Sequence, residues 1–72
     1  MKTHVTNKVR EFRTEAGMTQ AEMAKRVGVS RQSIISIEKS QYIPSLPLAL
    51  KIARLFNTST DAVFQLKESS ND

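Results

Sequence analysis

One short segment of the sequence gathers the side-chain types that hydrogen-bond to nucleic-acid bases: Arg31, Gln32, Ser36 and Lys39. A helix over residues 30–39, at about 100° per residue, places these side chains on one side and Ile34 and Ile37 on the other. Arginine pairs bidentately with guanine, glutamine with adenine, and an apolar group such as Ile35 can touch the methyl group of thymine. The pattern indicates base contacts from Arg31, Gln32, Ser36 and Ile35.

A structural explanation of this face stays open beside the functional one. Ile35 is unusual for a side chain that faces only solvent, and it could instead lie beneath residues 41–43. A helix face that merely contacts solvent more often mixes glutamate with lysine, whereas this face has one acid nearby, Glu38.

The residues before this segment predict two short helices joined by a tight turn, over residues 19–27 and 30–39. Thr19 and Glu22 have the spacing of a capping box, in which each side chain accepts a hydrogen bond from the backbone of the other. Gly28 ends the first helix, and Ser30 is a favourable N-cap for the second. Helix-turn-helix units are built in this way, although a helical hairpin inside an unrelated bundle has the same pattern.

Three further helices are predicted around this pair. The first precedes Gly17, which suits the left-handed conformation just after a helix. A longer one begins at Ser45 and ends at Asn57, and a last short one begins at Ser59. Apolar residues surround the longer helix nearly completely, which predicts a buried, central position: Leu46, Leu48, Ala49, Leu50, Ile52, Ala53, Leu55 and Phe56.

The two ends of the chain allow two interpretations. Val5 near the start and Phe64 and Leu66 near the end could share one face of a two-stranded antiparallel ribbon, or both ends could be frayed. We therefore expect an all-α, five-helix domain over residues 1–66, with the ribbon left open, and a polar tail over residues 67–72.

Composition excludes several kinds of site. The 72 residues include no cysteine and one histidine, so disulfides, thiolate zinc sites and histidine-rich metal centres are excluded. No set of nucleophile, base and orienting residue can be built, so we expect no enzyme, no cofactor and no metal. The apolar stretches are shorter than the roughly 18 residues needed to cross a bilayer, and no signal-peptide core is present. We expect a cytoplasmic protein.

The charge is basic and uneven along the chain. Eleven basic and seven acidic side chains give a net charge of +4. Residues 1–54 have ten basic and four acidic side chains, whereas residues 55–72 have one basic and three acidic ones. A basic body with an acidic end favours a polyanionic partner for the first three quarters of the chain. Composition alone does not separate nucleic acid from an acidic membrane.

Three runs of sequence carry a family resemblance: TQAEMA at 19–24, VGVSRQSI at 27–34 and IEK at 37–39. In this order and spacing they resemble the phage repressor/Cro (XRE) family of helix-turn-helix regulators, and residues 44–46, 52–53 and 59–64 continue the likeness. The resemblance covers about residues 7–64. It implies a five-helix domain of the lambda-repressor type that binds double-stranded DNA. The lack of an additional domain resembles the smallest members, of the cytolysin-repressor type, which have a terminal ribbon and act as homodimers.

The same resemblance implies roles for individual residues. Gln20 and Ser30 would contact DNA phosphates, and Arg13 and Glu38 would form a buried pair. Ser40 departs from the family because a glycine is usual after the third helix. We also expect phosphate contacts from Lys39, Gln41 and Tyr42, although Tyr42 could simply pack the loop.

We therefore predict a sequence-specific DNA-binding regulator, most simply a repressor, with no small-molecule ligand. Its small size favours a homodimer, with Val63, Phe64 and Leu66 at the contact and a palindromic operator. Two alternatives stay open: an antitoxin-like protein-interaction module of a toxin–antitoxin pair, and a nonspecific nucleic-acid binder.

Overall fold

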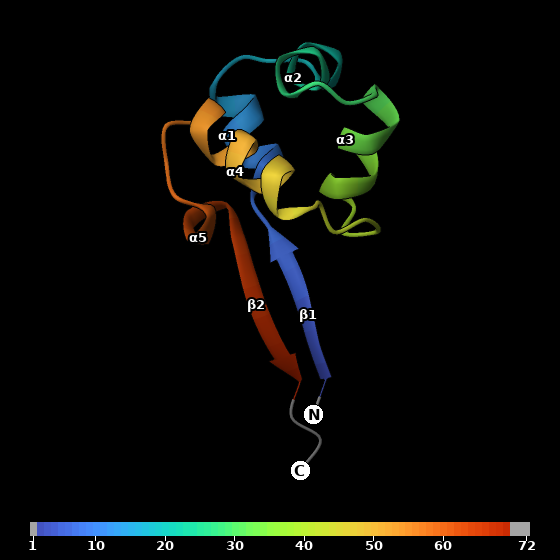
Figure 1. Ribbon diagram of the computed structural model, residues 1–72, viewed down its shortest axis with the longest axis vertical. Helices are drawn as coiled ribbons and strands as arrows, with labels where there is room; N and C mark the ends of the chain where they lie inside the picture. Colours follow the sequence, from blue (N-terminus) through green and yellow to red (C-terminus); the bar gives the residue numbers. More distant parts are fainter. Residues whose placement is uncertain (1, 70–72) are drawn as a thin grey trace.

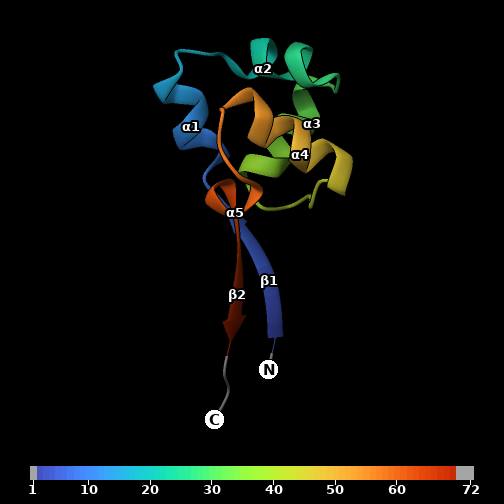
Figure 2. The same cartoon turned by 60° about the vertical axis from the view of Figure 1, so that its left-hand side comes forward.

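The computed structural model, which describes residues 2–69, has a helical body from which a two-stranded ribbon projects (Figures 1 and 2). The described part of the chain measures 43 × 23 × 22 Å, and both of its ends lie at the far end of the ribbon. No helix within residues 2–69 combines the length and apolar character required to span a membrane. The elements in chain order are β1 (Lys2–Asn7), α1 (Val9–Glu15), α2 (Gln20–Val27), α3 (Arg31–Glu38), α4 (Leu46–Leu55), α5 (Thr60–Val63) and β2 (Phe64–Ser69).

The ribbon is antiparallel, so of the two interpretations of the chain ends the ribbon is confirmed and the frayed ends are wrong. Val5 lies opposite Leu66, and Asn7 lies opposite Phe64, so the three apolar residues share one face as the alternation suggested. The ribbon is longer than the sequence predicted, because β2 continues through residues 67–69 instead of giving way to a tail at residue 67. Residues 70–72 of the expected tail lie outside the described residues.

Asn7 fastens the ribbon to the helical body. Its side-chain Nδ2 donates a hydrogen bond of 2.8 Å to the carbonyl of Ile37 in α3, and its Oδ1 accepts one of 3.1 Å from the backbone N–H of Val9. The next residue, Lys8, donates from its backbone N–H to the carbonyl of Val63, at 2.8 Å. These bonds tie the start of α1 to the end of α3 and to α5.

The core is built from one apolar face of each helix. Ile34 and Ile37 of α3 are fully buried, as their spacing predicted, so the opposite side of α3 faces outward. The other side chains without exposed surface come from α1, α2, α4 and α5: Val9, Met23, Ile52 and Val63.

The prediction that α4 is buried on all sides is wrong. Leu48, Ile52 and Ala53 are buried, but Leu46 and Leu50 keep 69% and 52% of their surface exposed. A chain of 72 residues has too little volume to cover a central helix completely, so α4 packs with one face and leaves the other uncovered.

The ends of α2 follow the sequence closely. Thr19 and Glu22 form both hydrogen bonds of the capping box, at 2.8 and 3.0 Å. The hydrogen bond from the backbone of Thr19 lowers the pKa of the Glu22 carboxyl, and that from the Thr19 side chain adds to the effect. The capping box therefore stabilises the fold above the unfolded-state pKa of Glu22, and this contribution is lost as the pH falls through the lower folded-state value. Gly28 ends the helix with a φ of 77°.

Ser40 adopts the left-handed conformation that a glycine would adopt more cheaply. Its φ is 59°, and the turn after α3 is closed by two hydrogen bonds of 2.9 Å, from the N–H of Ser40 to the carbonyl of Ile37 and from the N–H of Gln41 to that of Ser36. This is the Schellman arrangement, which satisfies carbonyls at the helix end. With serine at position 40 in place of the usual glycine, the turn still forms but its backbone is strained.

Ser40→Gly is expected to raise the free energy of unfolding by roughly 1 kcal/mol. A residue with a Cβ costs about 1–2 kcal/mol in the left-handed conformation, and the larger entropy of glycine in the unfolded state offsets part of the stability that is gained by removing this cost. Thermal unfolding followed by circular dichroism measures the change. Gly17→Ala is the matched control and should lower the free energy of unfolding. Gly17 has a φ of 71°, and an added Cβ would meet no atom within 4 Å, so the change tests backbone strain alone. A destabilised Ser40→Gly variant would contradict the strain.

Candidate nucleic-acid interface

The outward side of α3 gathers the residues predicted to contact bases. The helix begins after the N-cap Ser30, whose Oγ accepts a hydrogen bond of 3.1 Å from the N–H of Ser33. Arg31 and Gln32 in the first turn are exposed, and Ile35 and Ser36 in the next turn are partly exposed. An exposed first turn is the part of a recognition helix that enters the major groove.

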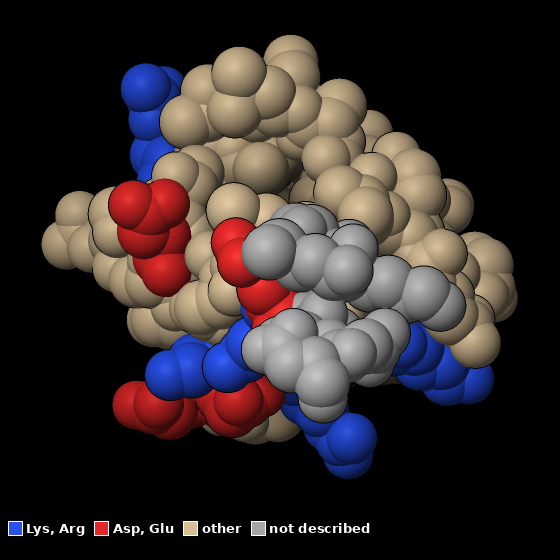
Figure 3. All heavy atoms as spheres, turned by 90° about the horizontal axis from the view of Figure 1, so that it is seen from below, with Lys and Arg blue, Asp and Glu red and all other residues tan. Residues whose placement is uncertain are grey.

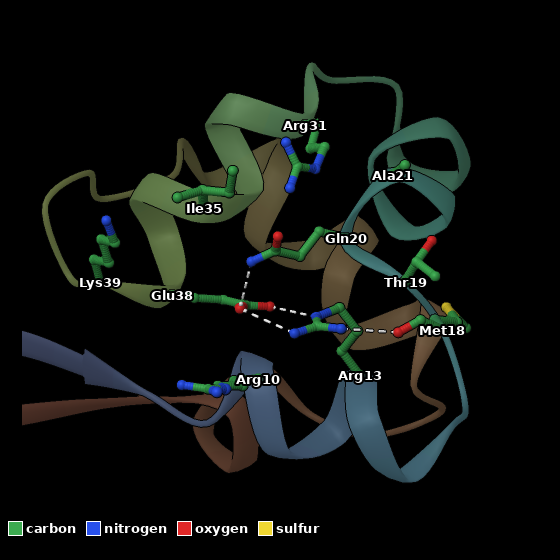
Figure 4. Close-up of a pocket in the computed structure, with 10 residues that line it drawn as sticks. All are labelled: Arg10, Arg13, Met18, Thr19, Gln20, Ala21, Arg31, Ile35, Glu38 and Lys39. Atoms are coloured by element: carbon green, nitrogen blue, oxygen red, sulfur yellow. Dashed lines mark hydrogen bonds and ion pairs between the residues drawn. The ribbon is translucent and has the colours of Figure 1, made fainter.

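A hollow of about 560 Å³ opens between α1, α2 and α3 (Figure 4). Ile35 and Arg31 line it from α3, and Gln20 lines it from the first turn of α2. Ile35 therefore borders this hollow, whereas residues 41–43 supply none of the hollow's lining.

An ion pair closes the floor of the hollow. Arg13 donates from Nε to Glu38 Oε2 at 2.6 Å and from Nη2 to Oε1 at 3.3 Å, a two-bond geometry that is stronger than a single contact. Its third nitrogen donates to the carbonyl of Met18 at 2.9 Å. The side chains of Arg13 and Glu38 are only 11% and 5% exposed. Glu38 is thus neutralised, so it places no free negative charge next to the outward face of α3.

Gln20 takes part in this cluster, which limits what it can offer a phosphate. Its Nε2 donates to Glu38 Oε1 at 3.2 Å, so one of its two N–H donors is already used. Its backbone N–H lies in the first turn of α2, where N–H groups have no partner inside the helix. Both the remaining side-chain donor and this backbone group are available for an anion.

The other predicted phosphate contacts lie around α3. Lys39 at the helix end and Gln41 in the turn are both exposed. Tyr42, which is 44% exposed, lines a second hollow of about 280 Å³ together with Gln32 and Ser36. Tyr42 thus lies beside the outward face of α3.

Arg10 is a cation that the sequence analysis missed. It lies on α1, one turn before Arg13, and lines the hollow with Arg31 and Lys39 (Figure 4). Within residues 2–69 the one ion pair is that of Arg13 with Glu38, so the positive charge of Arg10 is not neutralised there. The signal was its spacing, because residues three apart on a helix share a face.

One residue expected at the dimer contact does not fit that role. Val63 has no exposed surface, because it packs in the core, so a partner could not touch it. Phe64 is partly buried against the core, and Leu66 is 71% exposed. The sequence did not show that α5, with only four residues, turns its apolar side inward.

Comparison with known proteins places this geometry in a family. A family model described as helix-turn-helix matches residues 9–63. An HTH-type transcriptional regulator of Archaeoglobus fulgidus is 54% identical over 57 residues, which cover 79% of this chain and 81% of the relative. The HTH-type transcriptional regulator YgzD of Bacillus subtilis is 45% identical over 64 residues, covering 89% and 97%.

A solved structure shares the arrangement of the helices. The SOS-response transcriptional repressor LexA from Eubacterium rectale superimposes with a TM-score of 0.71 at 28% sequence identity. The match covers 75% of this chain and 57% of that one.

Proposed function

The chain belongs to the helix-turn-helix family of DNA-binding transcription regulators related to the phage repressors, and we propose that it is a sequence-specific repressor whose α3 lies in the major groove of double-stranded DNA. The observation that carries the proposal is the outward side of α3. Its first turn exposes Arg31 and Gln32 beside a hollow bordered by cations. The carboxylate of Glu38 does not reduce the positive charge of this surface, because it is paired with Arg13.

This surface makes two kinds of contact with DNA, to base edges and to phosphates. Arg31, Gln32, Ser36 and Ile35 face the base edges, which carry the sequence information. The groups that surround them contact phosphates and fix the position of α3 on the duplex: Gln20, Ser30, Lys39, Gln41 and Tyr42, with Arg10 added from the structure.

Repression follows from occupation of an operator. We propose that a homodimer in the cytoplasm places its two α3 helices in successive major grooves, on half-sites about 34 Å apart in a palindromic operator. The repressor role is supported by the likeness to LexA of Eubacterium rectale, which is named an SOS-response transcriptional repressor.

Selection of bound duplexes from random oligonucleotides tests the function. We expect a motif whose two halves are related by two-fold symmetry. Recovered sequences that share no motif would show a nonspecific nucleic-acid binder and contradict the proposal.

Lys39→Ala is expected to weaken binding to every DNA sequence alike and to reduce the slope of log K against log salt by about one unit, because one phosphate contact is lost. Titrations of the selected operator and of unrelated DNA at several salt concentrations measure both effects. Lys67→Ala is the matched control, since Lys67 is exposed on β2, away from α3, and should leave the slope unchanged. An unaltered slope for Lys39→Ala would show that Lys39 does not contact a phosphate.

A further inference from the structure

The hollow between α1, α2 and α3 concentrates positive charge. Arg10, Arg31 and Lys39 line it, and within the described part of the chain none of the three forms an ion pair. The one acid among the lining residues, Glu38, is neutralised by Arg13. Charge is unevenly spread over the molecule, since one side of it, seen from the ribbon end, shows a broad expanse without charged side chains (Figure 3). An anion in the hollow would therefore meet three uncompensated cations.

Hydrogen-bond donors from α2 and α3 face the same space. The guanidinium of Arg31 turns toward Gln20 (Figure 4). Gln20 keeps one side-chain N–H donor beyond its bond to Glu38, and its backbone N–H belongs to the first turn of α2, at the positive end of the helix dipole. Arginine donates forked pairs of hydrogen bonds to phosphate oxygens. The donor set therefore suits a ligand with phosphate groups.

The hollow also has room and apolar surface for the organic part of a ligand. Its volume of about 560 Å³ lies within the roughly 300–1,000 Å³ of clefts that hold small organic molecules. Met18, Ala21 and Ile35 line it with apolar side chains, and Ile35 is partly exposed there. A chain of phosphates joined to a flat base would use both the cations and this apolar surface, and that is the composition of a nucleotide.

We propose that the hollow binds a nucleoside diphosphate, with its two phosphate groups between Arg10 and Arg31 and its base against Ile35. Lys39 and the free donors of Gln20 contact the remaining phosphate oxygens. The residues of this site lie on three helices and meet only in the folded chain. The sequence therefore predicted no small-molecule ligand.

The nucleotide and the operator would exclude each other, and in this respect the inference rests on the proposed function. Arg31 is assigned to a base edge and Gln20 to a phosphate of the operator, and neither group can serve two partners at once. A nucleotide that holds Arg31 over the hollow withdraws it from the major groove. By linkage, the operator lowers the affinity for the nucleotide by the same factor by which the nucleotide lowers the affinity for the operator. Nucleotide binding thus regulates how much of the operator is occupied.

Isothermal titration calorimetry in the absence of DNA tests the site, at constant ionic strength and without divalent cations. We expect ADP to bind with one molecule per chain, and pyrophosphate to bind severalfold more weakly because it lacks the apolar contact. Adenosine, which lacks the phosphates, should not bind measurably.

Two variants connect this binding to the cations of the hollow. Arg10→Gln should raise the dissociation constants of ADP and pyrophosphate about tenfold, as expected when a charge-assisted contact is lost. Lys51→Gln removes an exposed cation of α4 outside the hollow, so it is the matched control and should leave both constants unchanged. Both positions are exposed, so the fold should persist, as circular dichroism can verify.

Competition with DNA supplies the second arm. With ADP at about ten times its own dissociation constant, the apparent dissociation constant of the operator should rise about tenfold. Absence of saturable ADP binding, equal affinity for adenosine and ADP, or equal effects of Arg10→Gln and Lys51→Gln would each overturn the proposal. Specific operator binding that ADP does not weaken would overturn this inference and leave the proposed function intact, whereas ADP binding by a chain without sequence preference would do the reverse.

Discussion

Glu38→Ala is expected to lower the free energy of unfolding by about 3–5 kcal/mol, the range for removal of one partner from a buried ion pair. The variant leaves the Arg13 guanidinium, 11% exposed, without its carboxylate, and Gln20 loses its acceptor as well. For a domain of this size each kcal/mol corresponds to roughly 4–8 °C in melting temperature, so a fall of more than about 12 °C is expected in a thermal scan. DNA binding should fail through loss of folding.

Two control variants separate the effect of removing a buried carboxylate on the melting temperature from the effect of removing a negative charge. Glu15→Ala removes an exposed carboxylate at the end of α1 and should change the melting temperature little. The double variant Arg13→Met with Glu38→Leu should recover much of the lost stability, because an apolar pair of similar volume leaves no buried charge. An unchanged melting temperature for Glu38→Ala would show that Glu38 contributes as a surface charge only.

Arg31→Ala is expected to cost about 1–3 kcal/mol of binding free energy on the operator and to relax the preference at one base pair, most simply a guanine. The exposed side chain in the first turn of α3 has the reach and the donor geometry for a bidentate contact. Gln32→Ala should do the same at a neighbouring position, with adenine as the base that glutamine pairs with. Binding of each variant to the operator and to all its single-base variants, at two salt concentrations, measures the effect.

Lys39→Ala is the contrasting variant for this experiment, since loss of a phosphate contact weakens all sequences together. If Arg31→Ala lost affinity equally on every sequence, Arg31 would be a phosphate contact. The base-contacting face would then have to be assigned to other residues of α3.

Local signals in the sequence predicted the elements that position this face. The capping residues Thr19 and Ser30 fix where α2 and α3 begin, and Gly28 fixes the turn between them, because these choices depend on backbone geometry within a few residues. The spacing of Ile34 and Ile37 then determined which side of α3 faces outward. The direction of the face therefore followed from residues adjacent in the chain.

Features that depend on packing between distant segments were not predictable in the same way. The contact of Asn7 with α3 joins residues thirty positions apart, and nothing near Asn7 in the sequence indicates it. The uncovered side of α4 and the burial of Val63 both depend on how much of each helix its neighbours cover. Apolar periodicity reports which residues could be buried, and the small size of the chain decides which of them are.

The most direct test of sequence-specific DNA binding by α3 is the ratio of two affinities at one salt concentration. The dissociation constant of the unaltered chain is measured for the selected operator and for a duplex of equal length and composition with the bases rearranged. The account predicts that the operator binds about 10³-fold tighter or more, and that Arg31→Ala lowers this ratio. Equal affinity for the two duplexes would contradict the account, because phosphate contacts alone do not distinguish them.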